Sequence, residues 1–222
     1  ADIKVLGLLD HPNIVKIIGY CIEEDHYRLL VCEYMDRGCL GRLLLGRTRT
    51  KYYEDRLPWS IRLKVAVGFA KGLAYLHSLE NWNAKLCMTW LAKSGLLDAD
   101  SCVSLQVRST SGYAAPEYFA TGDLTTASNI YTFGVVLLEI LTWRQCIDKN
   151  LPLSEQILAE SVKRNLSRKQ RIQLIIDPNI DGQYSPDLAT RAVKLAMKCL
   201  LEEPKQRPTA SDVVRELEEL QD

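Results

Sequence analysis

The sequence has no excess of charge of either sign. Its Lys and Arg residues number 28, as do its Asp and Glu residues, so the formal net charge of the 222 residues is zero. Proteins that bind nucleic acid usually carry a basic surface, so this balance argues against nucleic acid and against any strongly acidic or basic partner. With 47% hydrophobic and 25% charged residues, the chain has the composition of a folded protein with a sizeable core.

Cysteine and histidine occur without the spacing of a metal site or a disulfide framework. The 7 cysteines are an odd number and include no Cys-x-x-Cys pair, and the 3 histidines are equally dispersed. Scattered free thiols of this kind fit a reducing, intracellular compartment. We therefore predict no metal ligands and no structural disulfides.

No apolar run is long enough to cross a membrane. The most apolar stretch, residues 130–143, is too short to span a bilayer and contains Glu139, so it predicts a buried helix. The first residues also lack the basic and then apolar pattern of a secretory leader. We therefore expect a cytoplasmic protein without a transmembrane segment.

The hydrophobic pattern predicts a hairpin followed by a helical body. Two β-rich runs, residues 15–21 and 28–34, are separated by a polar segment. Apolar residues then recur at helical spacing after Pro58, which suits a first helical position. The predicted helices fall at residues 59–73, 130–143, 189–200 and 213–220.

Five short strings in a fixed order carry a family resemblance. HPNIVKIIGYC begins at His11, RLLVCEYMDRGCL at Arg28, SGYAAPEY at Ser111, DLTTASNIYTFGVVLLEILT at Asp123 and EPKQRP at Glu203. Each string alone is a weak signal, but five in this order are a strong one. In this respect the chain resembles the eukaryotic protein kinases, and most closely the plant receptor-like cytoplasmic serine/threonine kinases.

The resemblance implies an α+β, protein-kinase-like fold. Residues 1–35 correspond to a truncated N-lobe remnant with the family's αC helix, its fourth and fifth strands and the hinge. Residues 36–222 correspond to a mostly helical C-lobe whose catalytic loop is deleted. In the family the glycine-rich loop and the phosphate-binding lysine precede the αC helix. Because this chain opens at that helix, we expect it to lack both.

Several retained residues match structural positions of the family. Glu117 looks like the glutamate of the family's Ala-Pro-Glu motif, which pairs with an arginine near the C-terminus, and Arg207 stands at that arginine's position. A buried pair of this kind clamps the activation segment to the C-lobe, whereas two unrelated surface charges are the simpler alternative. Glu33 and Met35 lie in the segment that resembles the hinge, which implies them as candidate contacts for adenine.

The stretch that follows His77 is shorter than in the family. There, the corresponding helix leads into a catalytic loop of the HRDxKxxN type, but here SLENW runs directly into NAKLCMTWLAK. About 20 residues of the usual spacing are missing, including the catalytic aspartate and the metal-binding asparagine. His77 matches the end of the helix and not the histidine of that loop. We therefore predict that the chain has no catalytic residues.

The family's magnesium ligand is also replaced. Met88-Thr89-Trp90 occupies the position of the Asp-Phe-Gly motif, and a thioether is a poor ligand for a hard cation that prefers oxygen. Asn129 likewise replaces an aspartate that, in the family, accepts backbone N–H bonds from the catalytic loop. These losses agree with one another. We expect no cofactor and no bound magnesium, while residual ATP binding stays open.

These features predict a pseudokinase-type module that acts through protein–protein interaction in plant receptor-kinase or immune signalling. Its partner would be a kinase or an immune receptor, which would also hold it at the inner face of the plasma membrane. The unpaired hairpin edge, with Ile17 and Leu30 open to solvent, predicts self-association. One alternative is a kinase relative that retains ATP binding or weak phosphotransfer, and another is a non-functional fragment or defective gene model.

A Ser/Thr-rich stretch between residues 94 and 111 suggests modification by another kinase. Its candidate phosphosites are Ser104, Ser109 and Thr110. A solvated loop with ordinary turn residues explains the same composition and is the simpler interpretation.

Overall fold

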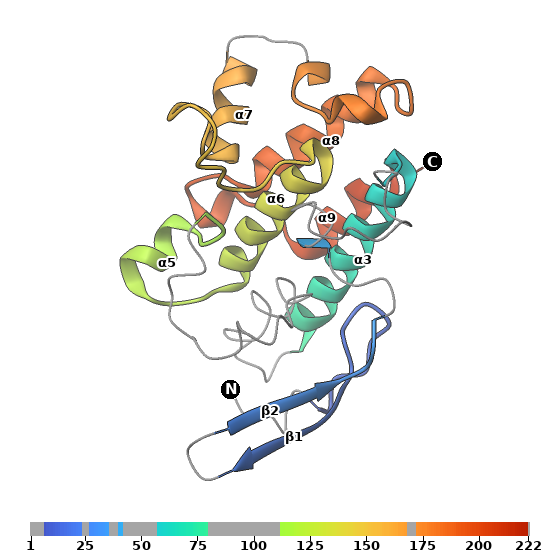
Figure 1. Ribbon diagram of the computed structural model, residues 1–222, viewed down its shortest axis with the longest axis vertical. Coiled ribbons are helices and arrows are strands. Elements are labelled where there is room, and N and C mark those ends of the chain that lie inside the picture. Colours follow the sequence, from blue (N-terminus) through green and yellow to red (C-terminus); the bar gives the residue numbers. More distant parts are fainter. Residues whose placement is uncertain are drawn as a thin grey trace.

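The computed structural model describes residues 7–23, 27–35, 40–41, 57–79, 112–167 and 172–221. A hairpin comes first and helices follow, so the predicted α+β order is confirmed, and the hairpin lies at one end of the molecule beyond the helices (Figure 1). The elements with described bounds are β1 (Ile17–Glu23), β2 (Tyr27–Cys32), α3 (Trp59–Ser78), α5 (Pro116–Thr121), α6 (Thr126–Thr142), α7 (Leu158–Ser167), α8 (Pro186–Cys199) and α9 (Ala210–Glu218), with the short 3-10 turns η2 (Ile172–Leu174), η3 (Pro178–Ile180) and η4 (Pro204–Gln206).

The two strands pair antiparallel, and the inner face of the hairpin is covered. Ile17 is only 7% exposed, because it packs with Leu9, Ile14 and Leu76 in a small core. Leu30 is half-buried against the same core. The prediction that Ile17 and Leu30 lie open to solvent is therefore wrong: the end of α3 and residues 9–14 cover that face.

Two glycines let the segment before the hairpin lie close to α3. A Cβ at Gly72 would come within 2.8 Å of the Asn13 carbonyl oxygen, and one at Gly68 within 2.9 Å of the Asn13 side-chain nitrogen. On the next turn the His11 ring stacks on Tyr75, with ring centroids 4.8 Å apart. The side of α3 that carries Gly68 and Gly72 thus packs against residues 11–13, which precede the hairpin.

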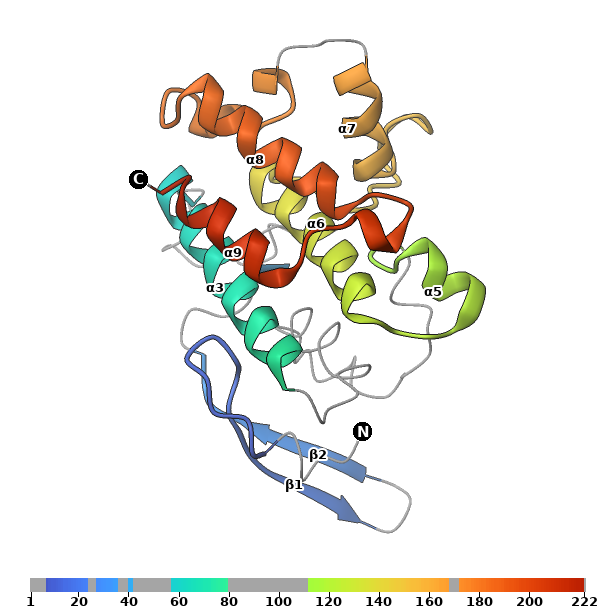
Figure 2. The same cartoon turned by 180° about the vertical axis from the view of Figure 1, so that it is seen from behind.

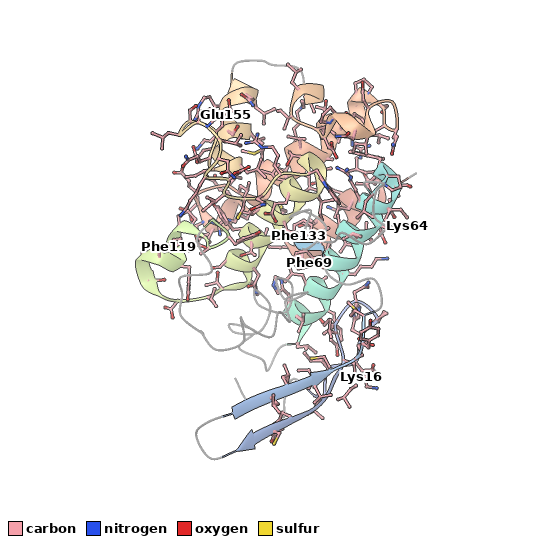
Figure 3. The ribbon with its side chains drawn as sticks, viewed as in Figure 1. Lys16, Lys64, Phe69, Phe119, Phe133 and Glu155 are labelled. Carbon is pink, nitrogen blue, oxygen red and sulfur yellow. The ribbon has the colours of Figure 1, made fainter. Side chains whose placement is uncertain are left out.

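Helix α6 forms the centre of the helical body. It is buried along nearly all of its length, as its apolar sequence predicts, and it packs against α3 and α8. Phe69 of α3 meets Phe133 of α6 with ring centroids 5.2 Å apart (Figure 3). Helix α9 lies along α3, on the face of the helical body that Figure 2 shows in front.

The close approach of α6 and α8 depends on one small residue. A Cβ at Gly134 would lie 2.7 Å from the Cβ of Cys199, so a larger side chain would push the helices apart. At the N-terminus of α6, Thr125 and Ser128 form a capping box, in which each side chain bonds the other residue's backbone N–H. Packing and capping together fix where α6 begins.

Candidate functional site

The Glu117 and Arg207 side chains meet between α5 and η4. Arg207 Nη1 donates to Glu117 Oε1 at 2.6 Å and Nη2 donates to Oε2 at 2.8 Å, so the ion pair is bidentate. The side chain of Arg207 is fully buried and that of Glu117 is 19% exposed. The Ser128 hydroxyl also donates to Glu117 Oε1, at 3.0 Å. The carboxylate therefore holds α5, the start of α6 and the turn before α9 together.

The remaining Arg207 donors are also used. Nε donates to the Leu201 carbonyl at 2.7 Å, Nη1 to that of Ala127 at 3.0 Å and Nη2 to that of Glu202 at 3.2 Å. Burial alone would raise the pKa of the Glu117 carboxyl, but the bonds from Arg207 and Ser128 outweigh it and hold that pKa below its usual value. The pair is thus charged at neutral pH.

A second carboxylate joins the segment before α5 to α6. The Tyr113 hydroxyl donates to Glu139 Oε1 at 2.7 Å, and the Cys146 backbone N–H donates to the same oxygen at 2.6 Å. Burial, together with the nearby Glu139 charge, raises the pKa of Tyr113, so the phenol stays protonated. The Thr132 hydroxyl adds a bond of 3.0 Å to the Tyr113 carbonyl. Residues 112–117 are therefore fixed to α6 at two places.

The end of α3 and the start of α6 meet through two uncharged side chains. His77 lies one residue before the end of α3, as predicted, and Asn129 Nδ2 is 3.4 Å from its Nε2. Burial lowers the pKa of His77 to about 4, so the imidazole is neutral at pH 7. Asn129 is itself buried. No formal charge resides on either side chain of this contact at neutral pH.

The predicted hinge residues have different environments. The Glu33 carboxylate turns back onto the hairpin, where its Oε1 accepts the Lys16 backbone N–H at 2.8 Å, and the Glu33 N–H donates to the Lys16 carbonyl at 2.9 Å. The Met35 side chain is exposed. The Glu33 carboxylate and the Glu33 backbone N–H are thus both engaged with the Lys16 backbone.

Several predicted positions lie outside the described residues. These are the Met88-Thr89-Trp90 segment and the candidate phosphosites Ser104, Ser109 and Thr110. Across the described ranges, no three His, Cys, Asp or Glu side chains are grouped to hold a metal ion. In the same ranges, no helix is both long enough and apolar enough to cross a membrane.

One fully buried ion pair was not anticipated from the sequence. Arg62 of α3 and Asp177, just before η3, are both 0% exposed, and Nη2 lies 2.5 Å from Oδ2. Arg62 also donates to the Leu57 carbonyl at 2.7 Å and to the Ile140 carbonyl at 3.0 Å, with the Trp143 ring 4.5 Å from its guanidinium carbon. The arginine thereby satisfies carbonyls at the C-terminal end of α6.

Comparison with known families assigns the chain to a class. The model for the protein kinase domain matches residues 94–217, and the model for protein tyrosine and serine/threonine kinases matches residues 1–88. The chain therefore belongs to the protein kinase family, and the fold above is the α+β fold expected of it.

The curated relatives that the chain resembles are plant protein kinases. It is 44% identical to the probable serine/threonine-protein kinase PBL11 of Arabidopsis thaliana, over 99% of this chain and 60% of the relative. Serine/threonine-protein kinase BIK1 of the same plant is 44% identical, over 100% of this chain and 59% of BIK1. The EPD1-interacting receptor-like cytoplasmic serine/threonine-protein kinase 5A of Gossypium barbadense is 46% identical over 100% of this chain and 50% of its own length.

The alignments show that the relatives are longer than this chain, both outside and inside the matched region. The chain spans between half and three-fifths of these relatives. The BIK1 alignment runs over 238 positions although the chain has 222 residues, so BIK1 carries residues within the matched region that have no counterpart here.

Proposed function

We propose that this chain is a non-catalytic, kinase-like module that acts by binding other proteins in plant receptor-kinase or immune signalling. The observation that carries the proposal is the short distance along the chain between α3 and the magnesium-site motif. Helix α3 ends at Ser78, and Met88-Thr89-Trp90 follows soon after it. In the family this interval is about 20 residues longer and contains the catalytic aspartate and the metal-binding asparagine.

The unmatched positions in the BIK1 alignment agree with this interpretation, because they require residues to be missing inside the matched region. The contact between His77 and Asn129 agrees as well. An aspartate at position 129 would accept N–H bonds from a catalytic loop, whereas the amide is satisfied by a neutral imidazole. Phosphoryl transfer depends on positioned charges and metal ions, so the proposed module has no source of that stabilisation.

The retained geometry supports a binding role. The contacts of Glu117 with Arg207 and of Tyr113 with Glu139 shape the surface around α5, and neither contact requires nucleotide or metal. One relative is named as interacting with EPD1 and as a receptor-like cytoplasmic kinase. By analogy, we place this chain in the cytoplasm, with a kinase or an immune receptor as the partner that brings it to the inner face of the plasma membrane. Self-association through the hairpin belongs to the same proposal.

The decisive experiment measures transfer and binding on the same preparation. Radiolabelled phosphate transfer to a generic substrate, and to the chain itself, should equal a no-protein control, while a relative such as BIK1 serves as the active control. Pull-down with purified cytosolic domains of receptor kinases should then recover the chain. Activity that follows the purified chain through successive columns would refute the proposal, as would a failure to bind any such domain.

The second candidate is a kinase relative that still binds ATP or transfers phosphate weakly. It is favoured by the 44% to 46% identity with proteins named as serine/threonine kinases. A thermal-shift series with ATP alone and with ATP plus magnesium tests it. Nucleotide stabilisation without magnesium would indicate residual adenine binding at the hinge, and stabilisation only with magnesium would favour the kinase alternative. Transcript sequence across residues 80–83 tests whether the short interval is a gene-model error.

A further inference from the structure

An exposed serine lies in the turn that precedes α7. Ser154 belongs to a tight turn over residues 152–155, which the Glu155 N–H closes by donating to the Pro152 carbonyl at 2.7 Å. Each residue of this turn is exposed, and Figure 3 labels Glu155 beside α7. A second protein can therefore reach Ser154 without the unfolding of any helix.

The base of this turn is held by bonds within the loop between α6 and α7. The Asp148 N–H donates to the Gln156 carbonyl at 2.9 Å, and the Gln156 side-chain amide donates to the Leu151 carbonyl at 3.0 Å. Ile147 and Ile157 pair beside it as an isolated antiparallel bridge. The turn therefore has a defined position although its tip is exposed.

Two arginines donate to the backbone of the turn. Arg164 of α7 donates through Nη1 to the Ser154 carbonyl. Arg144, just beyond the end of α6, donates through Nη2 to the Glu155 carbonyl at 2.9 Å. Both arginines are half-buried. Because each guanidinium is bonded to the carbonyl of Ser154 or of its neighbour, both lie within reach of a phosphate group on the Ser154 side chain.

We propose that Ser154 is a phosphorylation site and that Arg144 and Arg164 bind its phosphate. A guanidinium has five N–H donors, so one bond to a carbonyl does not use it up. Bonds between guanidinium and phosphate groups are charge-assisted and about twice as strong as neutral ones. The phosphate would thus join the end of α6, the turn and α7 more firmly than the two carbonyls do. This site lies outside the Ser/Thr-rich stretch at residues 94–111.

The acidic residues near the turn oppose the phosphate less than the arginines favour it. These residues are Asp148, Glu155 and Glu160. Asp148 Oδ1 accepts the Asn150 N–H at 3.0 Å, so this carboxylate is engaged within the loop. Glu155 and Glu160 are exposed, so water and salt screen their charges, whereas the half-buried arginines are screened less. The net effect on a phosphate should be attraction.

The phosphate would come from another protein kinase, because the chain itself is proposed to be non-catalytic. The Ser154 hydroxyl oxygen attacks the γ-phosphorus of the ATP bound to that kinase, and a new O–P bond forms. The bond from this phosphorus to the bridging oxygen breaks, ADP leaves with the electron pair, and the hydroxyl proton passes to a base of the other kinase. The inference therefore rests on the proposed function, in which the partner is a kinase, and it names a residue on which that partner acts.

The first test asks whether the site is used. The whole chain is expressed in plant leaf tissue, purified with phosphatase inhibitors and cut with trypsin, which releases residues 150–163 as one peptide. This peptide contains Ser154 and the buried Ser161, and fragmentation should place a phosphate on Ser154. A peptide found only unmodified, or modified only at Ser161, would overturn the proposal.

The second test asks whether the arginines bind the phosphate. Phosphoserine is incorporated at position 154 of the whole chain, and ³¹P NMR follows the titration of its phosphate in the folded chain and in urea. The pKa in urea should be about 6. Two nearby guanidinium groups should lower the pKa in the folded chain by about one unit or more. The phosphate should also raise the melting temperature by about 2–4 °C.

Arginine variants identify the groups responsible for that shift. Arg144→Gln and Arg164→Gln should each return the phosphate pKa toward its value in urea. Arg191→Gln removes an arginine that pairs with Glu219 on the surface, so it is the matched control and should leave the pKa unchanged. Equal pKa values in the folded chain and in urea would overturn the proposal. That comparison needs no variant, so it decides the question even if an arginine variant fails to fold.

The site and the proposed function fail separately. The purified chain is incubated with ATP and magnesium, with no other kinase present. Phosphate transferred to Ser154 under these conditions would refute the non-catalytic function and leave the site in place. A chain that binds receptor-kinase domains but carries no phosphate on Ser154 in leaf tissue would refute only the site.

Discussion

Removal of the Arg207 guanidinium should destabilise the helical body strongly. In Arg207→Ala, the Glu117 carboxylate loses both of its bonds from the arginine, and the carbonyls of Ala127, Leu201 and Glu202 lose a donor. Breaking one side of a buried pair costs about 3–5 kcal/mol. Because Glu117 is 19% exposed and keeps its bond from Ser128, we expect the lower end of that range.

The assay is thermal and urea unfolding of Arg207→Ala, with Arg191→Ala as the matched control. For a chain of this length, about 3 kcal/mol lowers the melting temperature by roughly 6–12 °C. Arg191 pairs with Glu219 at 2.8 Å on the surface, where an ion pair contributes only about 0–1 kcal/mol. Equal and small losses in the two variants would refute the reasoning, because they would mean that the Glu117–Arg207 pair is exposed to water.

The pH dependence supplies an independent check. The folded-state pKa of Glu117 lies below its ordinary value of 4.5, so the pair's contribution is complete above that pH and is lost as the pH falls through the folded-state pKa. Glu117→Gln should therefore be less stable than wild type at neutral pH and approach it in acid. A constant difference at all pH values would assign the effect to packing and not to charge.

Three further outcomes are expected in unfolding experiments. Gly72→Ala should cost about 1–3 kcal/mol because its Cβ would lie 2.8 Å from a backbone oxygen, whereas Gly68→Ala meets only a side chain and should be nearly neutral. Arg62→Ala should be at least as damaging as Arg207→Ala, since both members of its pair are 0% exposed. The buried neutral His77, with its pKa lowered to about 4 from 6.5, should make stability fall as pH decreases between these values, and His77→Gln should remove that dependence.

The order and type of the main elements could be predicted from the sequence. The helix predicted at residues 59–73 is part of α3, which begins one residue after Pro58 and extends to Ser78. The apolar run at residues 130–143 is the buried α6. Such long segments are predictable because a helix with one buried face has apolar residues at helical spacing. A helix buried on all faces is apolar throughout.

The faces of the hairpin could not be predicted in the same way. Residues 29–32 are apolar on both faces, so alternation does not say which face is covered. The choice depends on Leu76, which reaches the hairpin from the far end of α3 and buries Ile17. This contact joins segments far apart along the chain, and the prediction placed the exposed surface on the wrong face.

The partners of the buried charged side chains could not be predicted from the sequence either. Arg62 stands in the apolar stripe of α3, next to Leu63, and its partner Asp177 is 115 residues away. An arginine within such a stripe signals a buried partner but does not identify it. Glu139 in the apolar α6 gave the same signal, and the structure identifies its partners as Tyr113 and the Cys146 backbone. The bonds of these buried carboxylates fix the ends and neighbours of α6.

The proposed loss of catalysis is compatible with the kept fold because different groups serve the two purposes. The charges that hold the helical body are Glu117, Arg207, Arg62, Asp177 and Glu139, and all of them are satisfied by partners within the chain. None of them requires a phosphate or a magnesium ion to balance it. Loss of the residues that act on the phosphoryl group would therefore leave each of these five charges with its partner. Selection on a binding surface alone would then suffice to preserve α3, α6, α8 and α9. The proposed function therefore predicts a stable helical body. It places the binding surfaces on the exposed hairpin and around α5.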